Sequence, residues 1–245
     1  MSFGVVQIPA EKLNHAETEL ERTMEFDEWE PLYLRILADF NFDRRADEES
    51  AHILSEILRK HDNNGEHEKN GTLHDLQELV SEKRVAVCGN APSLAAEVEA
   101  IEAYESVGLE CVTIAADGAT TVLMACGLIP DVIVTDLDGT IEDIISASNL
   151  GSFVVVHAHG DNIPAVRSVV PQLNMARVLG TTQSKPFGDI HNFGGFTDGD
   201  RCVFLARACH AAEVALFGFD YDDPDVSRVK KKKLVWAKRL IEEYS

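Results

Sequence analysis

From residue 84 onward, short apolar runs alternate with segments of helical periodicity, and this alternation restricts the fold more than any other feature. The runs are rich in β-branched residues and short enough to be buried strands. Strands separated by helices build a parallel sheet through right-handed crossovers. The sequence therefore predicts an α/β fold with a doubly wound, mostly parallel sheet of about six strands, at 85–88, 111–117, 131–136, 153–156, 176–179 and 214–217. The predicted helices are at 93–106, 119–126, 141–149, 162–170, 200–211 and 229–244.

Residues 1–80 have a different pattern. Apolar side chains recur there at spacings of three and four, as in 32–37 and 51–58, which indicates helices. A polar stretch rich in Gly and Asn, 61–71, contains no apolar residue and is expected to be a linker. We therefore expect a helical N-terminal region (1–80) and an α/β catalytic domain (81–245). The N-terminal helices are expected either to pack on the sheet or to form a homodimer.

Two acidic turns, 117–119 and 135–139, end two consecutive predicted strands. The carboxyl ends of parallel strands meet at one edge of the sheet, so Asp117, Asp136 and Asp138 are expected to face one site. Carboxylates that lie so close repel one another unless a cation joins them, and oxygen ligands suit Mg²⁺. An Asp-Gly pair also makes ordinary turns. Two such turns on consecutive strands favour a magnesium and phosphate site.

The turn at 89–94, Gly-Asn-Ala-Pro-Ser-Leu, connects the first predicted strand to its helix. Backbone N–H groups at a helix N-terminus bind anions, so Gly89, Asn90 and Ser93 are candidates for contact with a nucleotide phosphate. The turn lacks the glycines of the dinucleotide fingerprint and the lysine of the Walker motif. A plain turn between strand and helix is an equally good interpretation.

Four polar side chains, His157, His159, Asp161 and Asn162, follow the fourth predicted strand. They are expected at the same edge of the sheet as the three aspartates. His157 and His159 are expected on one face of the strand, where imidazoles bind a metal or polarise a phosphate oxygen. Packing does not explain an apolar run that turns abruptly polar, so we favour a functional role.

A Gly-rich segment at 193–201 precedes a helix and contains two phenylalanines with Asp198, Asp200 and Arg201. A flat heteroaromatic ligand needs a stacking surface and a carboxylate that accepts its ring N–H groups, and arginine suits phosphate. Alternatively, Asp198 caps the helix and Asp200 complements its dipole. The two interpretations are compatible.

Four lysines, Lys230 to Lys233, open the last predicted helix, where positive charge opposes the helix dipole. Compensation is expected either from nearby Asp222, Asp223 and Asp225 or from a polyphosphate that reaches across the crevice. The local acids are the preferred partners.

The composition excludes several function classes. The 245 residues include 42 acidic and 22 basic ones, for a formal net charge of −20, which disfavours nucleic-acid binding. The five cysteines lie singly in apolar runs, so they are expected to be reduced rather than in zinc sites or disulfides. No run has the length and apolarity of a membrane span, and the N-terminus lacks a signal-peptide pattern. A cytoplasmic protein without a membrane partner is expected.

The order of the motifs resembles that of archaeal 6-hydroxymethyl-7,8-dihydropterin pyrophosphokinases, over about residues 84–220. The motifs that carry the resemblance are 89–94, 116–119 (Ala-Asp-Gly-Ala), 129–131 (Ile-Pro-Asp), 135–139 (Thr-Asp-Leu-Asp-Gly), 157–162 and 195–201. Thiamine pyrophosphokinases are more distantly similar, and Thr135, Gly139 and the absence of a β-rich tail separate the chain from them. Ala91 departs from the pattern, because the archaeal family often has Gly there.

The resemblance implies a Mg²⁺-dependent transfer of the β,γ-pyrophosphoryl group of ATP to the pterin hydroxymethyl oxygen, with release of AMP, in pterin or folate-type cofactor biosynthesis. It implies that Asp117, Asp136 and Asp138 bind Mg²⁺ and that His157 and His159 line the reaction centre. The residues that it places near nucleotide or pterin are Gly89, Asn90, Ser93, Asp161, Asn162, Asp198, Asp200 and Arg201. The general base is left open between a histidine and a carboxylate.

The segment Val132–Ile141 also resembles the first motif of haloacid-dehalogenase-type phosphatases, in which the first aspartate, here Asp136, is the nucleophile. In that family the motif ends the first strand of the domain, whereas two predicted strands precede it here. Chain order therefore disfavours a phosphatase. A phosphatase, a thiamine-type pyrophosphokinase and a non-catalytic nucleotide-binding module remain as alternatives to the pterin pyrophosphokinase.

An acidic surface with few lysines predicts adaptation to high salt, because screening removes most of the repulsion among the excess carboxylates. We expect the melting temperature of the chain to rise between low salt and molar KCl. Thermal unfolding followed by circular dichroism over a series of KCl concentrations measures this. A melting temperature that stays constant or falls in molar KCl would contradict a halophilic origin.

Overall fold

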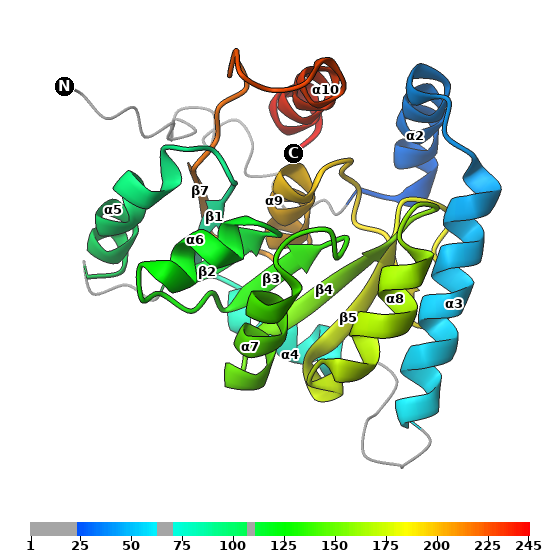
Figure 1. The fold of residues 1–245 in the computed structure, drawn as a ribbon, viewed down its shortest axis with the longest axis horizontal. Helices are drawn as coiled ribbons and strands as arrows, with labels where there is room; N and C mark the ends of the chain where they lie inside the picture. The colour runs from blue at the N-terminus through cyan, green and yellow to red at the C-terminus, as the bar shows by residue number, and fades with distance from the viewer. Residues whose placement is uncertain (1–23, 63–70, 107–110) are drawn as a thin grey trace.

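The computed structural model describes residues 24–62, 71–106 and 111–245. In these ranges seven parallel strands form one central sheet with helices on both faces (Figure 1). The sheet order is β6-β5-β4-β3-β2-β1-β7. The strands are β1 Arg84–Cys88, β2 Cys111–Ala116, β3 Val132–Thr135, β4 Phe153–Ala158, β5 Val178–Thr182, β6 Ile190–His191 and β7 Glu213–Phe217.

The doubly wound α/β fold predicted from the sequence is confirmed. The strand that the sequence did not indicate is β6, at the edge of the sheet. It contributes only two residues, which pair with Gly180 and Thr181 of β5. Two residues are too few to show the alternation by which a strand is recognised in a sequence.

The helices in the described ranges are α2 Phe26–Phe40, α3 Arg44–Asp62, α4 Gly71–Val80, α5 Leu94–Ser106, α6 Ala119–Ala125, α7 Ile141–Leu150, α8 Ile163–Val169, α9 Asp198–Ala208 and α10 Arg228–Tyr244. Two 3₁₀ turns, Val170–Gln172 and Met175–Arg177, follow α8. The largest difference from the prediction concerns α9, expected at 200–211. The helix ends earlier because His210 has a φ of +59°, which is outside the helical region.

Different helices cover the two faces of the sheet (Figure 1). On one face, α4 and α9 pack on strand residues such as Ile114 through Leu76 and Val203. On the other face, α3, α5, α6, α7 and α8 bury the alternate strand residues, such as Ile133. Because both faces are buried, the strands are apolar along their whole length, which explains why they stand out as continuous runs in the sequence.

The two longest N-terminal helices pack against the rest of the chain. α3 lies along β4, β5 and α8, and its Leu54 is fully buried there. The approach of α3 to β5 is close at Gly180, where a Cβ would lie 2.8 Å from Leu58 Cδ1. α2 packs on α9 and α10, where Tyr33 belongs to the same apolar cluster as Trp236. The two ends of the described chain therefore lie side by side.

Most of the predicted linker lies outside the described residues. α3 continues to Asp62, α4 begins at Gly71, and 63–70 between them are not described. The division of the chain at residue 80 and a homodimer remain predictions. In the described ranges, no helix combines the length and the apolar character that crossing a membrane requires.

The strand order reverses next to β1, which creates the crevice that the site occupies. The chain runs from β1 to β6 in one direction, and β7 then pairs with the other side of β1. In open α/β sheets, ligands bind where the strand order reverses, beyond the carboxyl ends of the strands. Here the loops after β1 and β7 meet closely: Ala91 N donates to Gly218 O at 2.9 Å, and a Cβ at Gly89 would lie 2.6 Å from that oxygen.

The burial of Leu54 generates a stability prediction for the N-terminal helices. We expect Leu54→Ala to lower the free energy of unfolding by about 2–5 kcal/mol, because it removes a buried side chain and leaves a cavity between α3 and the sheet. Leu34→Ala on α2 is the matched control, since Leu34 is 48% exposed. Urea denaturation of both variants measures the difference. Equal losses in the two variants would show that α3 is not part of the main core.

Candidate active site

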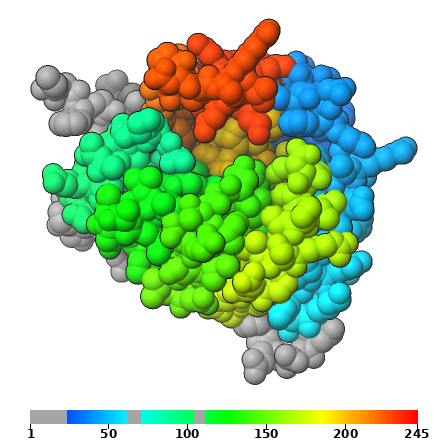
Figure 2. Space-filling model, viewed as in Figure 1, coloured from blue at the N-terminus to red at the C-terminus, as the bar shows by residue number. Residues whose placement is uncertain are grey.

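A cleft of about 500 Å³ lies at the carboxyl ends of the strands. The loops after β1, β2, β3, β4 and β7 form one side of it, and the start of α9, the turn between α2 and α3, and the first turns of α10 form the other. Figure 2 shows the hollow beneath the orange and red residues of the C-terminal segment. The motifs that the sequence analysis selected from distant parts of the chain therefore meet in one place.

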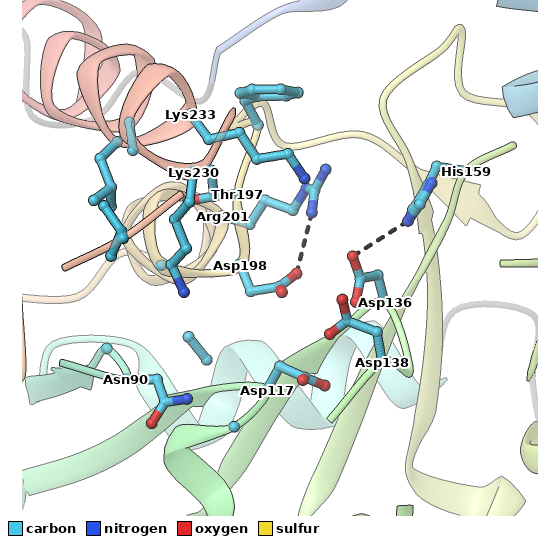
Figure 3. Close-up of a pocket in the computed structure, with 18 of the residues that line it drawn as sticks. Asn90, Asp117, Asp136, Asp138, His159, Thr197, Asp198, Arg201, Lys230 and Lys233 are labelled. Carbon is cyan, nitrogen blue, oxygen red and sulfur yellow. Dashed lines mark hydrogen bonds and ion pairs between the residues drawn. The ribbon is translucent and has the colours of Figure 1, made fainter. Parts of the chain in front are cut away.

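Three carboxylates form the floor of the cleft. Asp117 directly follows β2, while Asp136 and Asp138 follow β3 (Figure 3). One oxygen of each lies within 4.8 Å of the others. The Thr135 hydroxyl donates to Asp117 Oδ1 and accepts from Leu137 N at 2.8 Å, so it joins the two turns. The predicted convergence of the three aspartates is thus present in the structure.

The backbone at the carboxylates is held in unusual conformations. Asp117 has a φ of +27° and Leu137 a φ of +67°. Such conformations are costly for residues with a side chain and are concentrated at functional sites. The neighbouring glycines allow close approach, because a Cβ at Gly139 would collide with Asp117 Oδ2 and one at Gly118 with Asn90 Nδ2. The Asp-Gly pairs therefore shape the cleft as well as the turns.

The electrostatics of the cluster indicate a place for a cation. Burial raises the pKa of Asp117 to about 7, and the charges of Asp138 and Asp136 add to the effect against the hydrogen bond from Thr135. Burial and the charge of Asp136 raise the pKa of Asp138. Asp136 Oδ1 is buried without a hydrogen-bond partner. A hard divalent cation such as Mg²⁺ would relieve the repulsion and satisfy this oxygen, so the donor set fits it.

Of the two histidines in the segment 157–162 at the end of β4, His159 lines the cleft. Its Nε2 lies 3.2 Å from Asp136 Oδ2. Although burial opposes the shift, the hydrogen bond from His159 and the charge of Arg201 lower the pKa of Asp136 to about 2. Asp136 is therefore the member of the cluster that stays ionised most readily. Asp161 also lines the cleft, with an exposed side chain.

His157 and Asn162 lie behind the cleft and do not line it. His157 Nδ1 is 3.2 Å from Thr181 Oγ1, and burial, together with the charge of Arg201, holds the pKa of this histidine well below its usual value. Asn162 Nδ2 donates to the carbonyl oxygens of Asp136 at 2.8 Å and His157 at 2.7 Å. Asn162 therefore ties the turn after β4 to the turn after β3.

The beginning of α9 contributes an ion pair to the cleft. Arg201 Nη1 lies 3.1 Å from Asp198 Oδ1, and both side chains line the cleft (Figure 3). Burial and the charge of Asp136 raise the pKa of Asp198 well above its usual value. A cation near Asp198, or a ligand group that donates a hydrogen bond to it, would stabilise this carboxyl group.

The alternative in which Asp198 caps α9 is wrong. Thr197 is the N-cap, with extended backbone angles, and Asp200 completes a capping box by accepting from Thr197 N at 2.7 Å. Asp200 also accepts from Phe196 N at 2.6 Å and is fully buried outside the cleft. The sequence Thr-Asp-Gly-Asp matches the spacing of this box, so Thr197 rather than Asp198 is the cap, and the helix begins at Asp198, two residues before the predicted start.

In the loop after β1, the predicted phosphate-binding residues are divided. Gly89 and Asn90 line the cleft, and the side-chain amide of Asn90 lies against Gly118 (Figure 3). Ser93 is exposed and lies outside the cleft. A contact between Ser93 and a ligand in this cleft therefore has no support from the structure.

Comparison with known proteins shows the family of the chain. A sequence model of the family described as "6-hydroxymethylpterin diphosphokinase MptE-like" matches residues 56–226. Three archaeal proteins named 6-hydroxymethyl-7,8-dihydropterin pyrophosphokinase are similar to the chain. Those of Methanothermobacter thermautotrophicus, Pyrococcus furiosus and Methanocaldococcus jannaschii are 46%, 38% and 35% identical over 233, 232 and 237 residues. Each match covers 89% of this chain and 94% or 95% of the relative.

The chain belongs to the 6-hydroxymethylpterin diphosphokinase family. The resemblance and the enzyme class inferred from the sequence motifs are therefore confirmed. Among solved structures, a MAf glycosyltransferase from Magnetospirillum magneticum AMB-1 matches 64% of this chain and 29% of its own length, with 21% identity and a TM-score of 0.39.

Parts of the cleft of this family member come from residues outside the matched range 56–226. Asp47 on α3 is the residue there that the sequence analysis missed. It accepts hydrogen bonds from Tyr33 Oη at 2.7 Å, Gln183 Nε2 at 2.8 Å and Gly160 N at 2.9 Å. Gln183 Oε1 in turn lies 3.4 Å from Arg201 Nη2. A single aspartate within a helix carries no signal in the sequence, because two of its three partners, Gly160 and Gln183, lie more than a hundred residues away.

The network around Asp47 generates a second stability prediction. We expect Asp47→Ala to lower the free energy of unfolding by about 2–4 kcal/mol, because it leaves two buried donors and one half-buried donor without an acceptor. Asp47→Asn should lose less, since it keeps an oxygen for Gly160 N. Asp161→Ala, which removes an exposed carboxylate, is the control and should change stability by less than about 0.5 kcal/mol. Urea denaturation measures all three, and equal stability of Asp47→Ala and Asp161→Ala would contradict the network.

Proposed function

We propose that the chain is a Mg²⁺-dependent pyrophosphokinase that transfers the β,γ-pyrophosphoryl group of ATP to 6-hydroxymethyl-7,8-dihydropterin and releases AMP. The observation that carries the proposal is the carboxylate cluster at the strand ends, where one oxygen each of Asp117, Asp136 and Asp138 lies within 4.8 Å of the others, in a chain of this family. The reaction would serve the biosynthesis of pterin or folate-type cofactors.

In the proposed reaction, the pterin hydroxymethyl oxygen attacks the β-phosphorus of ATP. The bond from that phosphorus to the oxygen of the α-phosphate breaks, AMP leaves with the electron pair, and the alcohol loses its proton. Little covalent chemistry falls to the protein, so catalysis consists mainly of alignment and charge neutralisation. Asp117, Asp136 and Asp138 would hold Mg²⁺, which when bound neutralises phosphate oxygens and orients them.

Other side chains of the cleft have distinct proposed roles. His159 would accept the alcohol proton or polarise a phosphate oxygen, since it is the histidine that reaches the cleft, 3.2 Å from Asp136. Arg201, held by Asp198 at 3.1 Å, would face phosphate or pterin. We propose that His157, Asn162 and Asp200 are positioning residues, because Asn162 and Asp200 hold turns from behind and His157 links β4 to Thr181 of β5.

The proposal predicts that AMP forms from ATP only when the pterin alcohol and Mg²⁺ are both present. We expect pyrophosphorylated pterin and AMP in equal amounts, measured by chromatography of the reaction mixture. Chelation of Mg²⁺ should abolish both products. AMP formation with thiamine instead of the pterin would favour the thiamine-type alternative, and phosphate release without ATP would favour a phosphatase. If the chain binds nucleotide but no mixture yields AMP, the result would favour a non-catalytic nucleotide-binding module.

The carboxylate cluster predicts a second result for this reaction. We expect Asp136→Asn and Asp138→Asn to lower AMP formation by roughly 100-fold or more, because each removes charge that holds the metal and its phosphates. Mg²⁺ should also raise the melting temperature of the wild type but not of these variants, since binding to the folded state alone stabilises it. Glu142→Gln, which changes an exposed carboxylate on α7, should behave like the wild type. A wild-type melting temperature that does not respond to Mg²⁺ would argue against the metal site.

A further inference from the structure

The four lysines at the start of α10 have three different environments. Lys230 and Lys233, three residues apart and so on one side of the helix, line the cleft. Lys232 donates to the carbonyl oxygen of Asp39, lies 3.8 Å from its carboxylate, and sits 4.7 Å from the centroid of the Phe40 ring. Lys231 is exposed and outside the cleft. The run is therefore not a uniformly solvated patch.

The cleft lysines lack the local partners that the sequence favoured. In the described part of the chain, no carboxylate forms an ion pair with Lys230 or Lys233 within 4.0 Å. Two of the acids that precede α10 serve their own loop instead, because Asp223 Oδ1 accepts from Asp225 N at 2.8 Å and Asp220 Oδ1 from Asp222 N at 2.9 Å. The preferred compensation by Asp222, Asp223 and Asp225 is thus not what the structure shows.

The helix that carries these lysines is firmly held. Ser227 caps it by accepting from Lys230 N at 3.1 Å. Trp236 Nε1 donates to Asp39 Oδ2 at 2.9 Å, and Leu240 is fully buried in the cluster shared with α2. Lys230 lies in the first turn of α10, where a positive charge opposes the helix dipole. Two ammonium groups that line a cleft without an ion-pair partner, on an anchored helix, indicate an anionic ligand.

The distribution of charge in the cleft also indicates an anionic ligand. Among the lysines and arginines that line it in the described ranges, Arg201 is already paired with Asp198. Lys230 and Lys233 extend from α10 on the wall opposite the carboxylate floor (Figure 3). A polyphosphate brought near three carboxylates needs positive charge on its other side.

We propose that Lys230 and Lys233 bind the polyphosphate of the nucleotide from the side opposite the carboxylate cluster. Lys233 faces the transferred pyrophosphoryl group near Asp138, and Lys230 faces the α-phosphate on the side of Asn90 (Figure 3). Lysine suits this role as a point charge that adapts to a phosphate oxygen. The inference rests on the proposed function, because it takes ATP as the donor substrate.

The test compares Lys230→Ala, Lys233→Ala and the two arginine variants with Lys231→Ala as the control from the same run. Calorimetry at constant ionic strength measures binding of α,β-methylene-ATP with Mg²⁺, which resists cleavage at the bond broken in the reaction. We expect at least about tenfold weaker binding for each cleft alanine variant, partial recovery with arginine, and unchanged binding for Lys231→Ala. Lys233→Ala should bind AMP as the wild type does, because its contact is with the pyrophosphoryl group.

The outcomes separate this inference from the proposed function. If the wild type forms AMP and the cleft variants bind the analogue as tightly as Lys231→Ala, the inference is overturned and the function stands. If the analogue binds in a way that depends on Lys230 and Lys233 but no pterin alcohol yields AMP, the inference holds and the function fails. Melting temperatures check the fold of each variant, and the arginine variants keep the test valid should an alanine variant unfold.

Discussion

The repulsion among three closely spaced carboxylates is the constraint around which this cleft is built. One oxygen each of Asp117, Asp136 and Asp138 lies within 4.8 Å of the others, and burial together with the charges of Asp138 and Asp136 raises the pKa of Asp117 to about 7. Two residues that follow packed strands, Asp117 and Leu137, hold strained backbone conformations in this arrangement. The adjacent glycines, Gly118 and Gly139, have no side chain that would block the close approach. A divalent cation, as the proposed function requires, would relieve the repulsion in this cluster.

The helices at the two ends of the described chain complete the site. Asp47 on α3 holds the turn that carries His159 and, through Gln183, reaches Arg201. Asp39 on α2 holds α10, which carries the cleft lysines. Neither helix belongs to the matched family range 56–226 in full. The N-terminal region, which offers no catalytic motif in its sequence, thus holds other elements of the cleft in position.

The sequence motifs indicated where the candidate site lies better than they indicated which of their residues line it. The sequence analysis located the strand-end motifs correctly, yet within each motif the structure divides the residues. His159 reaches the cleft while His157 packs on Thr181, and Arg201 reaches it while Asp200 caps α9. Polar residues two positions apart look alike in a sequence. The end of the strand or the start of the helix decides which of them faces the ligand, and a shift of one or two residues exchanges their roles.

The sequence by itself determined the α/β fold, because buried parallel strands leave continuous apolar runs, and it determined the three aspartates, because strand ends share one edge of the sheet. Only the tertiary structure decided the short strand β6 and the Asp47 network. It also decided which lysines of the run 230–233 line the cleft, which one is exposed and which one contacts Asp39. These depend on contacts between residues far apart in the chain, such as Lys232 with Asp39. Local periodicity carries no information about such distances, and packing sets them.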